Sequence, residues 1–458
     1  MPEKYDAVVI GTGQAGPPFA AKAAEHGWRV AIVERHKLGG TCVNAGCIPT
    51  KTLVASARAV HMARRGDEFG FSVGDDAPVV DMARVKARMK RVSGRSNEMV
   101  GRWIDSLADV DLVHGHAVLD GPNRVVVDGE VLETERVFIN VGARPRVPSF
   151  AGVDDVKFMT STGILELDEV PEHLIVVGGS YIGLEFAQLH RRFGAQVTVI
   201  EQGPRLTGRE DPDVSKAVQE VLEAEGIDVR LNAECIGFAP HPKGTTATVD
   251  CEDGPPDVVG SHLLLAVGRV PNTGDLGLDT AGVETDDRGF VVVDDQLRTN
   301  VDGIWALGDC NGRGAFTHTS YNDHEIAAAN LFDDDPRRIS DRITAYALYI
   351  DPPLGRVGMT ETEARASGRN VLVAERPMRH VGRAIEMSET AGFMKFLVDA
   401  DTDELLGGAI FGITGDEVIH SLLDLMYAKA PYTTITRAMH IHPTVSELVP
   451  TTLHTLHP

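Results

Sequence analysis

Cysteine is scarce in this chain, basic residues are outnumbered, and long apolar runs are missing. Five cysteines in 458 residues, at positions 42, 47, 235, 251 and 310, are too few and too scattered for the disulfide scaffold of a small secreted protein. Lys and Arg total 44 against 67 Asp and Glu, and the net charge of −23 argues against nucleic acids and anionic membranes as partners. No apolar run approaches the roughly 20 residues that span a bilayer, and the start MPEKYDAVVIGTG lacks the basic and apolar regions of a signal peptide. We therefore expect a cytoplasmic protein of two to four domains that acts on small molecules.

The first motif is a glycine turn between two expected strands. An apolar run at 5–10 precedes Gly11, Gly13 and Gly16, and a second run ends in Glu34, 18 residues after the last glycine. This spacing is typical of a dinucleotide-binding βαβ unit. The glycines let backbone N–H groups approach a pyrophosphate at a helix N-terminus, and Glu34 is placed to accept from a ribose hydroxyl.

A second unit of the same kind begins at residue 174. A strand at 174–177 is followed by Gly178, Gly179 and Gly183, a helix through residue 189, and a strand that ends before Glu201. The middle glycine of the usual pattern is Ser180, which we interpret as a tolerated substitution. Two such units in one chain favour two dinucleotide sites, and the alternative is an α/β domain whose glycine turns bind no ligand.

The run GGTCVNAGCIPTK, at 39–51, places two cysteines five residues apart. In an ideal helix their Cα atoms would be roughly 8 to 9 Å apart, whereas a disulfide requires less than about 7 Å. Cys42 and Cys47 can therefore pair only where the helix entry is distorted, and Gly46 and Pro49 favour that distortion. A strained disulfide is easily reduced, and a thiol at a helix N-terminus has a lowered pKa. A structural disulfide and a metal pair remain as alternatives, although this is a poor zinc spacing and no resident metal is expected.

Other segments are less specific. The strands at 137–145 and 263–272 each close with Gly-x-x-Pro, at Gly142 and Gly268, and Asp309 follows an apolar strand. Residues 56–109 indicate a solvated helical hairpin. From residue 345 onward, alternating strands precede an amphipathic helix at about 416–430, and no nucleotide motif is present, which is typical of an assembly domain.

These motifs, in this order, resemble the pyridine nucleotide-disulfide oxidoreductases, which include dihydrolipoamide dehydrogenase, glutathione reductase and mercuric reductase. The two fingerprints, the cysteine motif, ALGD before residue 310 and HPTVSE near the end carry the resemblance over essentially the whole chain. It implies an α/β fold with two Rossmann-like dinucleotide-binding domains and a C-terminal α+β dimerisation domain. The implied FAD domain comprises 1–149 and 274–340, the NAD(P) domain 150–273, and the interface domain 345–458.

The resemblance also implies a role for each site residue. Cys47 would contact the flavin and Cys42 would exchange with the acceptor. Lys51 and Glu185 would pair beside the flavin and the nicotinamide, and Tyr181 would gate the nicotinamide pocket. His442 and Glu447 would act as an acid–base pair on the partner's exchange cysteine in a homodimer with a shared active site.

The residues implied for FAD binding are Gly11, Gly13, Gly16, Glu34, Gly40, Thr41, Lys51, Gly142 and Asp309. Those implied for the nicotinamide cofactor are Gly178, Gly179, Gly183, Glu201 and Gly268. NADH is favoured over NADPH because Glu201 repels a 2′-phosphate, although Arg205 and Arg209 follow closely and could bind one.

The implied function is that of an NAD(P)H:disulfide/thiol or soft-metal oxidoreductase, which passes electrons through FAD and the Cys42–Cys47 disulfide to an acceptor. The resemblance is greatest to mercuric-reductase-like and reactive-chlorine-resistance flavoproteins, by CIPTKTLV, GREDPDV and DPPLGRVGMTE. However, no cysteine follows Cys310, and mercuric reductases carry a C-terminal cysteine pair, so mercury is in doubt as the substrate. Dihydrolipoamide dehydrogenase and a redox sensor are the alternatives. Cys235, Cys251 and Cys310 are expected to be ordinary thiols.

Overall fold

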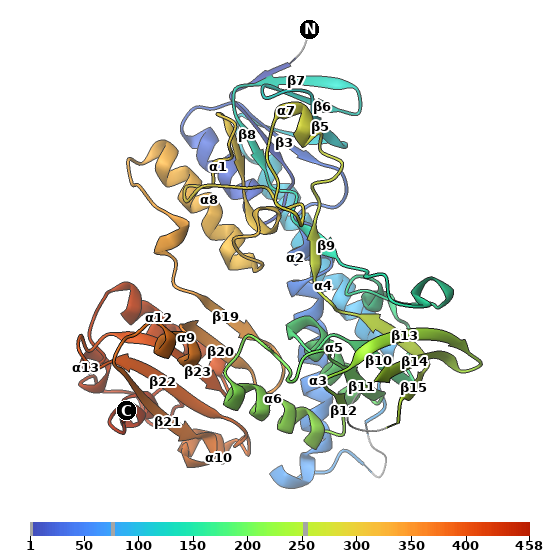
Figure 1. The fold of residues 1–458 in the computed structure, drawn as a ribbon, viewed down its shortest axis with the longest axis vertical. Coiled ribbons are helices and arrows are strands. Elements are labelled where there is room, and N and C mark those ends of the chain that lie inside the picture. Colours follow the sequence, from blue (N-terminus) through green and yellow to red (C-terminus); the bar gives the residue numbers. More distant parts are fainter. Residues whose placement is uncertain (1–2, 75–77, 251–254) are drawn as a thin grey trace. The chain divides into compact units, whose positions relative to one another are not determined.

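The structure is a computed structural model that describes residues 3–74, 78–250 and 255–458. The chain divides into two compact units (Figure 1). The first contains the described residues up to 52 together with 86–146 and 268–342, and the second contains those of 53–85, 147–267 and 343–458. Two long helices, α3 (Cys47–Arg64) and α4 (Met82–Asp105), contribute residues to both.

A five-stranded parallel sheet forms the centre of the first unit, in the order β18-β8-β2-β3-β4. The strands are β18 (Ile304–Ala306), β8 (Val137–Ile139), β2 (Ala7–Ile10), β3 (Val30–Glu34) and β4 (Val110–His114). Strand β2 is apolar throughout because both of its faces are buried. Ala7 and Val9 pack in the core that includes the helices α1 (Gly16–Glu25) and α8 (Thr317–Phe332).

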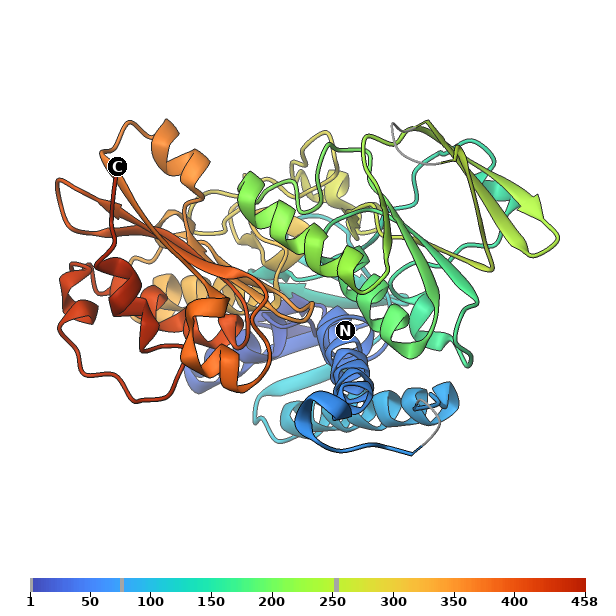
Figure 2. The ribbon, with the colours of Figure 1, turned by 90° about the horizontal axis from the view of Figure 1, so that it is seen from below.

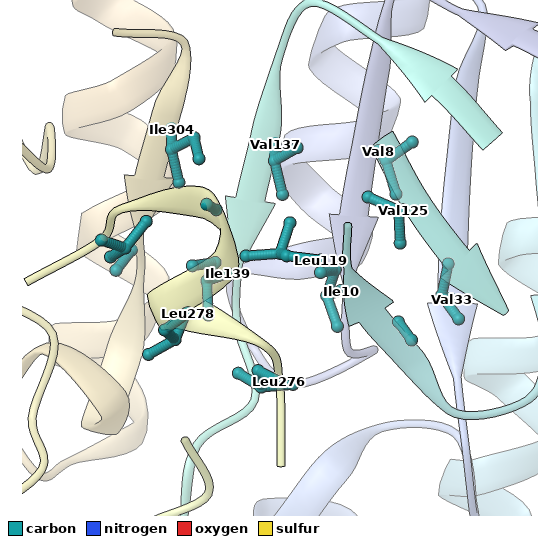
Figure 3. Packing of buried hydrophobic residues seen from close by; sticks show 14 of the residues in the cluster. Val8, Ile10, Val33, Leu119, Val125, Val137, Ile139, Leu276, Leu278 and Ile304 are labelled. Atoms are coloured by element: carbon teal, nitrogen blue, oxygen red, sulfur yellow. The ribbon is translucent and has the colours of Figure 1, made fainter. Parts of the chain in front are cut away.

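The other face of this sheet is covered by a second sheet, in the order β1-β7-β6-β5. Its strands are β1 (Glu3–Tyr5), β7 (Glu130–Thr134), β6 (Arg124–Val127) and β5 (Ala117–Leu119). Val8 and Ile10 of β2 meet Leu119 and Val125 there, together with residues around α7 (Leu278–Ala281) (Figure 3). The two-stranded sheet of β9 (Ala143–Pro145) and β17 (Arg269–Pro271) completes the strands of this unit.

The second unit contains another parallel sheet, in the order β12-β11-β10-β16. Its strands are β12 (Asp228–Arg230), β11 (Gln196–Ile200), β10 (His173–Val177) and β16 (His262–Leu265). The helices α5 (Tyr181–Phe193) and α6 (Pro212–Ala224) follow β10 and β11. An antiparallel sheet of β13 (Glu234–His241), β14 (Gly244–Asp250) and β15 (Asp257–Gly260) shares an apolar core with the parallel one.

A five-stranded antiparallel sheet, in the order β19-β20-β23-β22-β21, forms the C-terminal part of the second unit. Its strands are β19 (Ala345–Leu348), β20 (Leu354–Gly358), β23 (Leu405–Phe411), β22 (Phe393–Asp399) and β21 (Val371–Pro377). Helices α12 (His420–Tyr427), α13 (Thr433–Thr436) and α14 (Leu448–Leu453) lie along one face (red in Figure 2). The remaining helices here are α9 (Glu361–Ala366), α10 (Gly382–Glu386) and α11 (Gly415–Val418).

The α/β architecture agrees with the sequence prediction, and several boundaries differ from it. The strands expected at 137–145 and 263–272 are each two strands in different sheets, β8 and β9 and β16 and β17. The run at 5–10 is two strands in different sheets, because it is interrupted at Asp6. The helix expected at 416–430 is broken into α11 and α12. Helix α5 continues four residues beyond the expected end, to Phe193, where Gly194 with a φ of 120° terminates it. Within the described ranges, no helix is both long enough and apolar enough to cross a membrane.

Candidate active site

The first glycine turn joins β2 to α1, and other atoms approach closely at its glycines. Gly11 has a φ of 106°, and a Cβ there would lie 2.4 Å from the Asn140 carbonyl oxygen. A Cβ on Gly16 would lie 2.2 Å from the Gly11 oxygen, and one on Gly13 would lie 3.2 Å from Asn140 Nδ2. Because glycine alone fits, the turn brings the N-terminus of α1 to the carboxyl end of the sheet, where a pyrophosphate binds in folds of this kind.

Glu34 ends strand β3 beside this turn. Its Oε2 accepts hydrogen bonds from the Thr12 hydroxyl at 2.5 Å and the Thr12 N–H at 3.1 Å, and its Oε1 accepts from His36 N–H at 2.9 Å. Each carboxylate oxygen has two lone pairs, so Glu34 keeps acceptor capacity for a ribose hydroxyl. The structure therefore brings Glu34 to the glycine turn.

Gly40 and Thr41 open the short helix α2 (Gly40–Asn44) close to the same turn. Gly40 has a φ of 62°, and a Cβ on it would lie 2.9 Å from the Gly13 Cα. The segment before the cysteines therefore packs against the dinucleotide turn. Glycine is required at this close approach.

Asp309 follows β18 at the same edge of the sheet. Its burial raises its pKa, and the positive charge of Arg269, with Nε 3.6 Å from the carboxylate, partly offsets the effect of burial. Gly142, after β8, and Gly268, before β17, have φ values of 64° and 105°. A glycine turn, an acid at the end of β3 and an acid after β18, all at the carboxyl edge of one parallel sheet, form a donor and acceptor set that fits an extended dinucleotide such as FAD.

The cysteine pair lies where the helix is interrupted. Helix α2 ends at Asn44, Ala45 has a φ of −148°, and α3 begins at Cys47. The distorted entry expected from the sequence is therefore present. Both cysteines are thiols and are not joined in a disulfide in this structure, with Cys42 half-buried and Cys47 exposed. The pKa of Cys42 is raised, first by hydrogen bonding with the Cys47 side chain and then by burial.

Two helix N-termini meet at Cys47. Cys47 is the first residue of α3, and its Sγ lies 3.0 Å from the hydroxyl of Thr317, the first residue of α8. The positive ends of both helix dipoles favour a thiolate at this sulfur. Lys51, one turn further along α3, adds a positive charge that lowers the pKa of Cys42. Thr317 was missed in the sequence because 270 residues separate it from Cys47.

The second glycine turn repeats the geometry of the first. Gly178 has a φ of 116°, and a Cβ on it would lie 2.5 Å from the Ala266 oxygen. A Cβ on Gly183 would lie 2.1 Å from the Gly178 oxygen. Ser180 is the exposed N-cap residue of α5, so the substitution of the middle glycine is accommodated at the helix start.

Glu201 lies in an open pocket of about 390 Å³ beside this turn. Its Oε2 accepts from Gly179 N–H at 2.6 Å and its Oε1 from Gly203 N–H at 2.8 Å. Arg205 and Arg209 line the same pocket. The acid and the two arginines that would decide between NADH and NADPH therefore share one cavity.

Tyr181 and Glu185 lie in the first turns of α5. The carboxylate of the buried Glu185 accepts from Tyr349 N–H at 3.1 Å, and the Tyr181 hydroxyl donates to Glu210 at 3.2 Å. Lys51 belongs to the first unit and Glu185 to the second, so their pairing stays a prediction. Glu210 was missed in the sequence, although an acid pair before Pro212 hints at a buried contact.

His442 and Glu447 meet near the C-terminus, as the resemblance implies. His442 Nδ1 lies 3.0 Å from both carboxylate oxygens of Glu447. The His442 side chain is 80% exposed, whereas that of Glu447 is 18% exposed. The Glu447 carboxylate therefore orients the ring and leaves Nε2 available for proton transfer. Met439 and Ile441, just before it, are 99% and 80% exposed.

Cys310 takes no part in the site. Cys310 is fully buried, which raises the pKa of its thiol to about 12, and its Sγ donates to the Leu307 oxygen at 3.2 Å. Cys251 and the side chain of Cys235 lie outside the described residues. In the part of the chain that the structure describes, no group of three or more His, Cys, Asp or Glu residues could hold a metal ion.

Comparison with known proteins gives two family matches. The model of the pyridine nucleotide-disulphide oxidoreductases matches residues 5–324, and the model of their dimerisation domain matches 344–453. Among curated relatives, the probable pyridine nucleotide-disulfide oxidoreductase RclA of Escherichia coli is 36% identical over 448 residues, which cover 97% of each chain. The dihydrolipoyl dehydrogenase of Chlorobaculum parvum is 35% identical over 97% of this chain and 96% of its own. A mercuric reductase of Lysinibacillus sphaericus is 32% identical over 96% of this chain and 82% of its own.

A solved structure is similar over nearly the whole chain. It is the Cu(II) complex of the HOCl-induced flavoprotein disulfide reductase RclA from Escherichia coli, with a TM-score of 0.89 and 33% sequence identity. The match covers 99% of this chain and 99% of that one.

Proposed function

The chain belongs to the pyridine nucleotide-disulfide oxidoreductase family, an FAD-dependent class of enzymes, and from that premise we propose that it reduces a small disulfide or a metal ion at Cys42 and Cys47. The observation that carries the proposal is the broken helix entry, with Cys47 at two helix N-termini and 3.0 Å from Thr317. Bound FAD would supply the two-electron link between the nicotinamide and the cysteines.

The residues that would hold FAD are Gly11, Gly13, Gly16, Glu34, Gly40, Thr41, Lys51, Gly142 and Asp309. Those that would hold the nicotinamide cofactor are Gly178, Gly179, Gly183, Glu201 and Gly268. Glu201 favours NADH because its carboxylate would lie against a 2′-phosphate.

In the reduced protein the exchange thiol would act first. The Cys42 thiol gives up its proton and attacks one sulfur of an acceptor disulfide, which forms a mixed disulfide and releases the other sulfur as a thiolate that takes up this proton. The Cys47 thiolate then attacks the Cys42 sulfur, re-forms the Cys42–Cys47 disulfide and releases the second thiolate. His442, oriented by Glu447, is the proposed proton donor, supplied by the partner subunit of a cytoplasmic homodimer.

A metal acceptor would use the same two thiols. Two Cu(II) ions could each accept one electron while the dithiol becomes the disulfide. The Cu(II) complex of the similar RclA structure supports copper as the metal to test first. The lack of a cysteine after Cys310 weighs against mercury, because no thiol in that segment could deliver it.

The dihydrolipoyl dehydrogenase activity of one relative makes dihydrolipoamide a second candidate. Anaerobically reduced enzyme should be mixed with lipoamide, glutathione disulfide and Cu(II), with Cys42→Ser as the control and ferricyanide as an acceptor that takes electrons directly from reduced flavin. We expect Cys42→Ser to lose the reduction of disulfides and copper while it keeps that of ferricyanide. Equal turnover of all acceptors by wild type and Cys42→Ser would contradict the proposal. Slow turnover with every small acceptor would favour a redox sensor.

A further inference from the structure

A buried carboxylate adjoins the pocket proposed for the nicotinamide cofactor. The Glu210 side chain has no exposed surface, and it directly follows Arg209, which lines the pocket. Its Oε1 accepts two hydroxyl protons, from Tyr181 at 3.2 Å and from Tyr346 at 2.7 Å. The two tyrosine rings meet edge-on, with their centroids 5.5 Å apart. Glu210 therefore ties the first residue of α5 to strand β19.

Arg356 fixes the other oxygen of Glu210. The Arg356 side chain is 1% exposed, and its Nε and Nη2 donate to Glu210 Oε2 at 3.0 Å and 2.5 Å. Strand register places Arg356 opposite Tyr346, so both reach the carboxylate from neighbouring strands. Separating a buried ion pair leaves an uncompensated charge, which is costly. The carboxylate is therefore a fixed acceptor.

The residues that follow Glu210 are held in the same way. Lys395, from β22, has a side chain 2% exposed, and its Nζ lies 2.6 Å from Asp213, 3.3 Å from Asp211 and 3.2 Å from Glu361. Two buried cations of the C-terminal sheet therefore anchor the start of α6. The segment that contacts Tyr181 is therefore held by buried ion pairs.

Tyr181 is the partner that can move. Both tyrosines are half-buried, whereas Glu210 and Arg356 are buried, and the bond of Tyr181 to Glu210 is the longer of the two tyrosine bonds. Burial and the negative charge of Glu210 raise the pKa of both tyrosines far above the ordinary value, so both hydroxyls keep their protons and remain donors.

We propose that Glu210 is a latch: it holds the hydroxyl of Tyr181, the residue that the resemblance makes the gate of the nicotinamide site, and the nicotinamide binds only when that hydroxyl leaves Glu210. The inference rests on the proposed function, because it takes the pocket as the nicotinamide site and Tyr181 as its gate. Glu210 is a positioning residue in this scheme, and Arg356 keeps it in place. The apparent affinity for a ligand falls with the fraction of protein in the competent state, so a weaker latch should tighten nicotinamide binding.

The test compares a dinucleotide with its fragment. NAD⁺ carries the nicotinamide that the gate excludes, whereas ADP-ribose occupies the rest of the pocket without it. The dissociation constant of each ligand for the oxidised holoenzyme should be measured by calorimetry. If steady-state kinetics show a preference for NADPH, NADP⁺ and 2′-phospho-ADP-ribose take the place of the two ligands. Glu210→Gln removes a charge beside the buried Arg356 and endangers folding, whereas Tyr181→Phe removes one oxygen and keeps the ring.

We expect Tyr181→Phe to tighten NAD⁺ by roughly 3- to 10-fold, the effect of one hydrogen bond, and to leave ADP-ribose unchanged. Tyr5→Phe is the matched control, because it removes a hydroxyl that donates to the carboxylates of Glu3 and Asp111 in the first unit, and it should leave the ratio of the two dissociation constants unchanged. The latch would be overturned if the ratio of the NAD⁺ and ADP-ribose dissociation constants changed equally in both variants, or did not change in Tyr181→Phe. Either result would leave the proposed function intact. Failure of the wild-type holoenzyme to bind either dinucleotide would refute the proposed function, and the latch with it.

Discussion

Replacing Glu201 should change the choice between NADH and NADPH. The carboxylate accepts from the N–H groups of Gly179 and Gly203, at 2.6 and 2.8 Å, so it is held in the pocket and cannot turn away from a 2′-phosphate. Glu201→Ala removes the negative charge and leaves those two N–H groups to face the ligand. A charge-assisted contact is worth about 1.5 to 3 kcal/mol, which corresponds to roughly one to two orders of magnitude in relative kcat/KM.

The assay is steady-state reduction with each cofactor in turn. We expect the wild type to prefer NADH and Glu201→Ala to shift the ratio of kcat/KM toward NADPH by roughly 10- to 100-fold. Glu220→Ala is the control, since it removes the same charge from an exposed position on α6 that does not line the pocket. A wild-type preference for NADPH would show that Arg205 and Arg209 dominate. If the ratio moves no further in Glu201→Ala than in Glu220→Ala, the reasoning is refuted.

Three further predictions concern proton donation, the thiolate and stability in acid. When the inactive variants Cys42→Ser and His442→Ala are refolded as a mixture, up to about a quarter of the active sites should recover, because half of randomly paired dimers are heterodimers and each has one intact site. Inactive heterodimers, once verified as such, would exclude a shared site. Thr317→Val should move the titration of the Cys47 thiolate absorbance to higher pH, whereas Thr317→Ser should not, because only the serine keeps a hydroxyl beside the sulfur. Identical titration curves for the two variants would show that Thr317 does not stabilise the thiolate. Burial lowers the pKa of His190 to about 3, so the unfolded chain takes up this proton first and the free energy of unfolding falls as pH drops from about 6.5 toward 3. Between pH 7 and pH 5, the free energy of unfolding from denaturant titrations should fall by about 2 kcal/mol less in His190→Phe than in the wild type. The same pH dependence in both proteins would contradict this.

Local features of the site were predictable because their physics lies in neighbouring residues. Gly46 between Cys42 and Cys47 predicted the break between α2 and α3. The glycine turns were predictable because these positions accept no side chain, so the glycines themselves mark the turn. A Cβ at Gly11 or Gly178 would lie 2.4 or 2.5 Å from a backbone oxygen.

Contacts over long sequence distances were not predictable in the same way. Glu210 meets Arg356 across 146 residues, and no local pattern names the partner. A signal does exist, because Arg356 and Lys395 each lie between apolar residues of a buried strand, LGRVG and FMKFLVD. A cation at such a position needs a buried acid. The prediction of one continuous helix at 416–430 was wrong, because the apolar periodicity of the segment does not reveal the break at Ile419.

The central claim is that Cys47 lies against the flavin and Cys42 exchanges with the acceptor. It is tested most directly by the absorption spectrum of the anaerobic enzyme after reduction by two electrons. We predict a long-wavelength thiolate-to-flavin band in the wild type, its loss in Cys47→Ser, and its presence in Cys42→Ser even before reduction. A band that survives in Cys47→Ser and disappears in Cys42→Ser would reverse the two roles, and a wild type without any band would contradict the account.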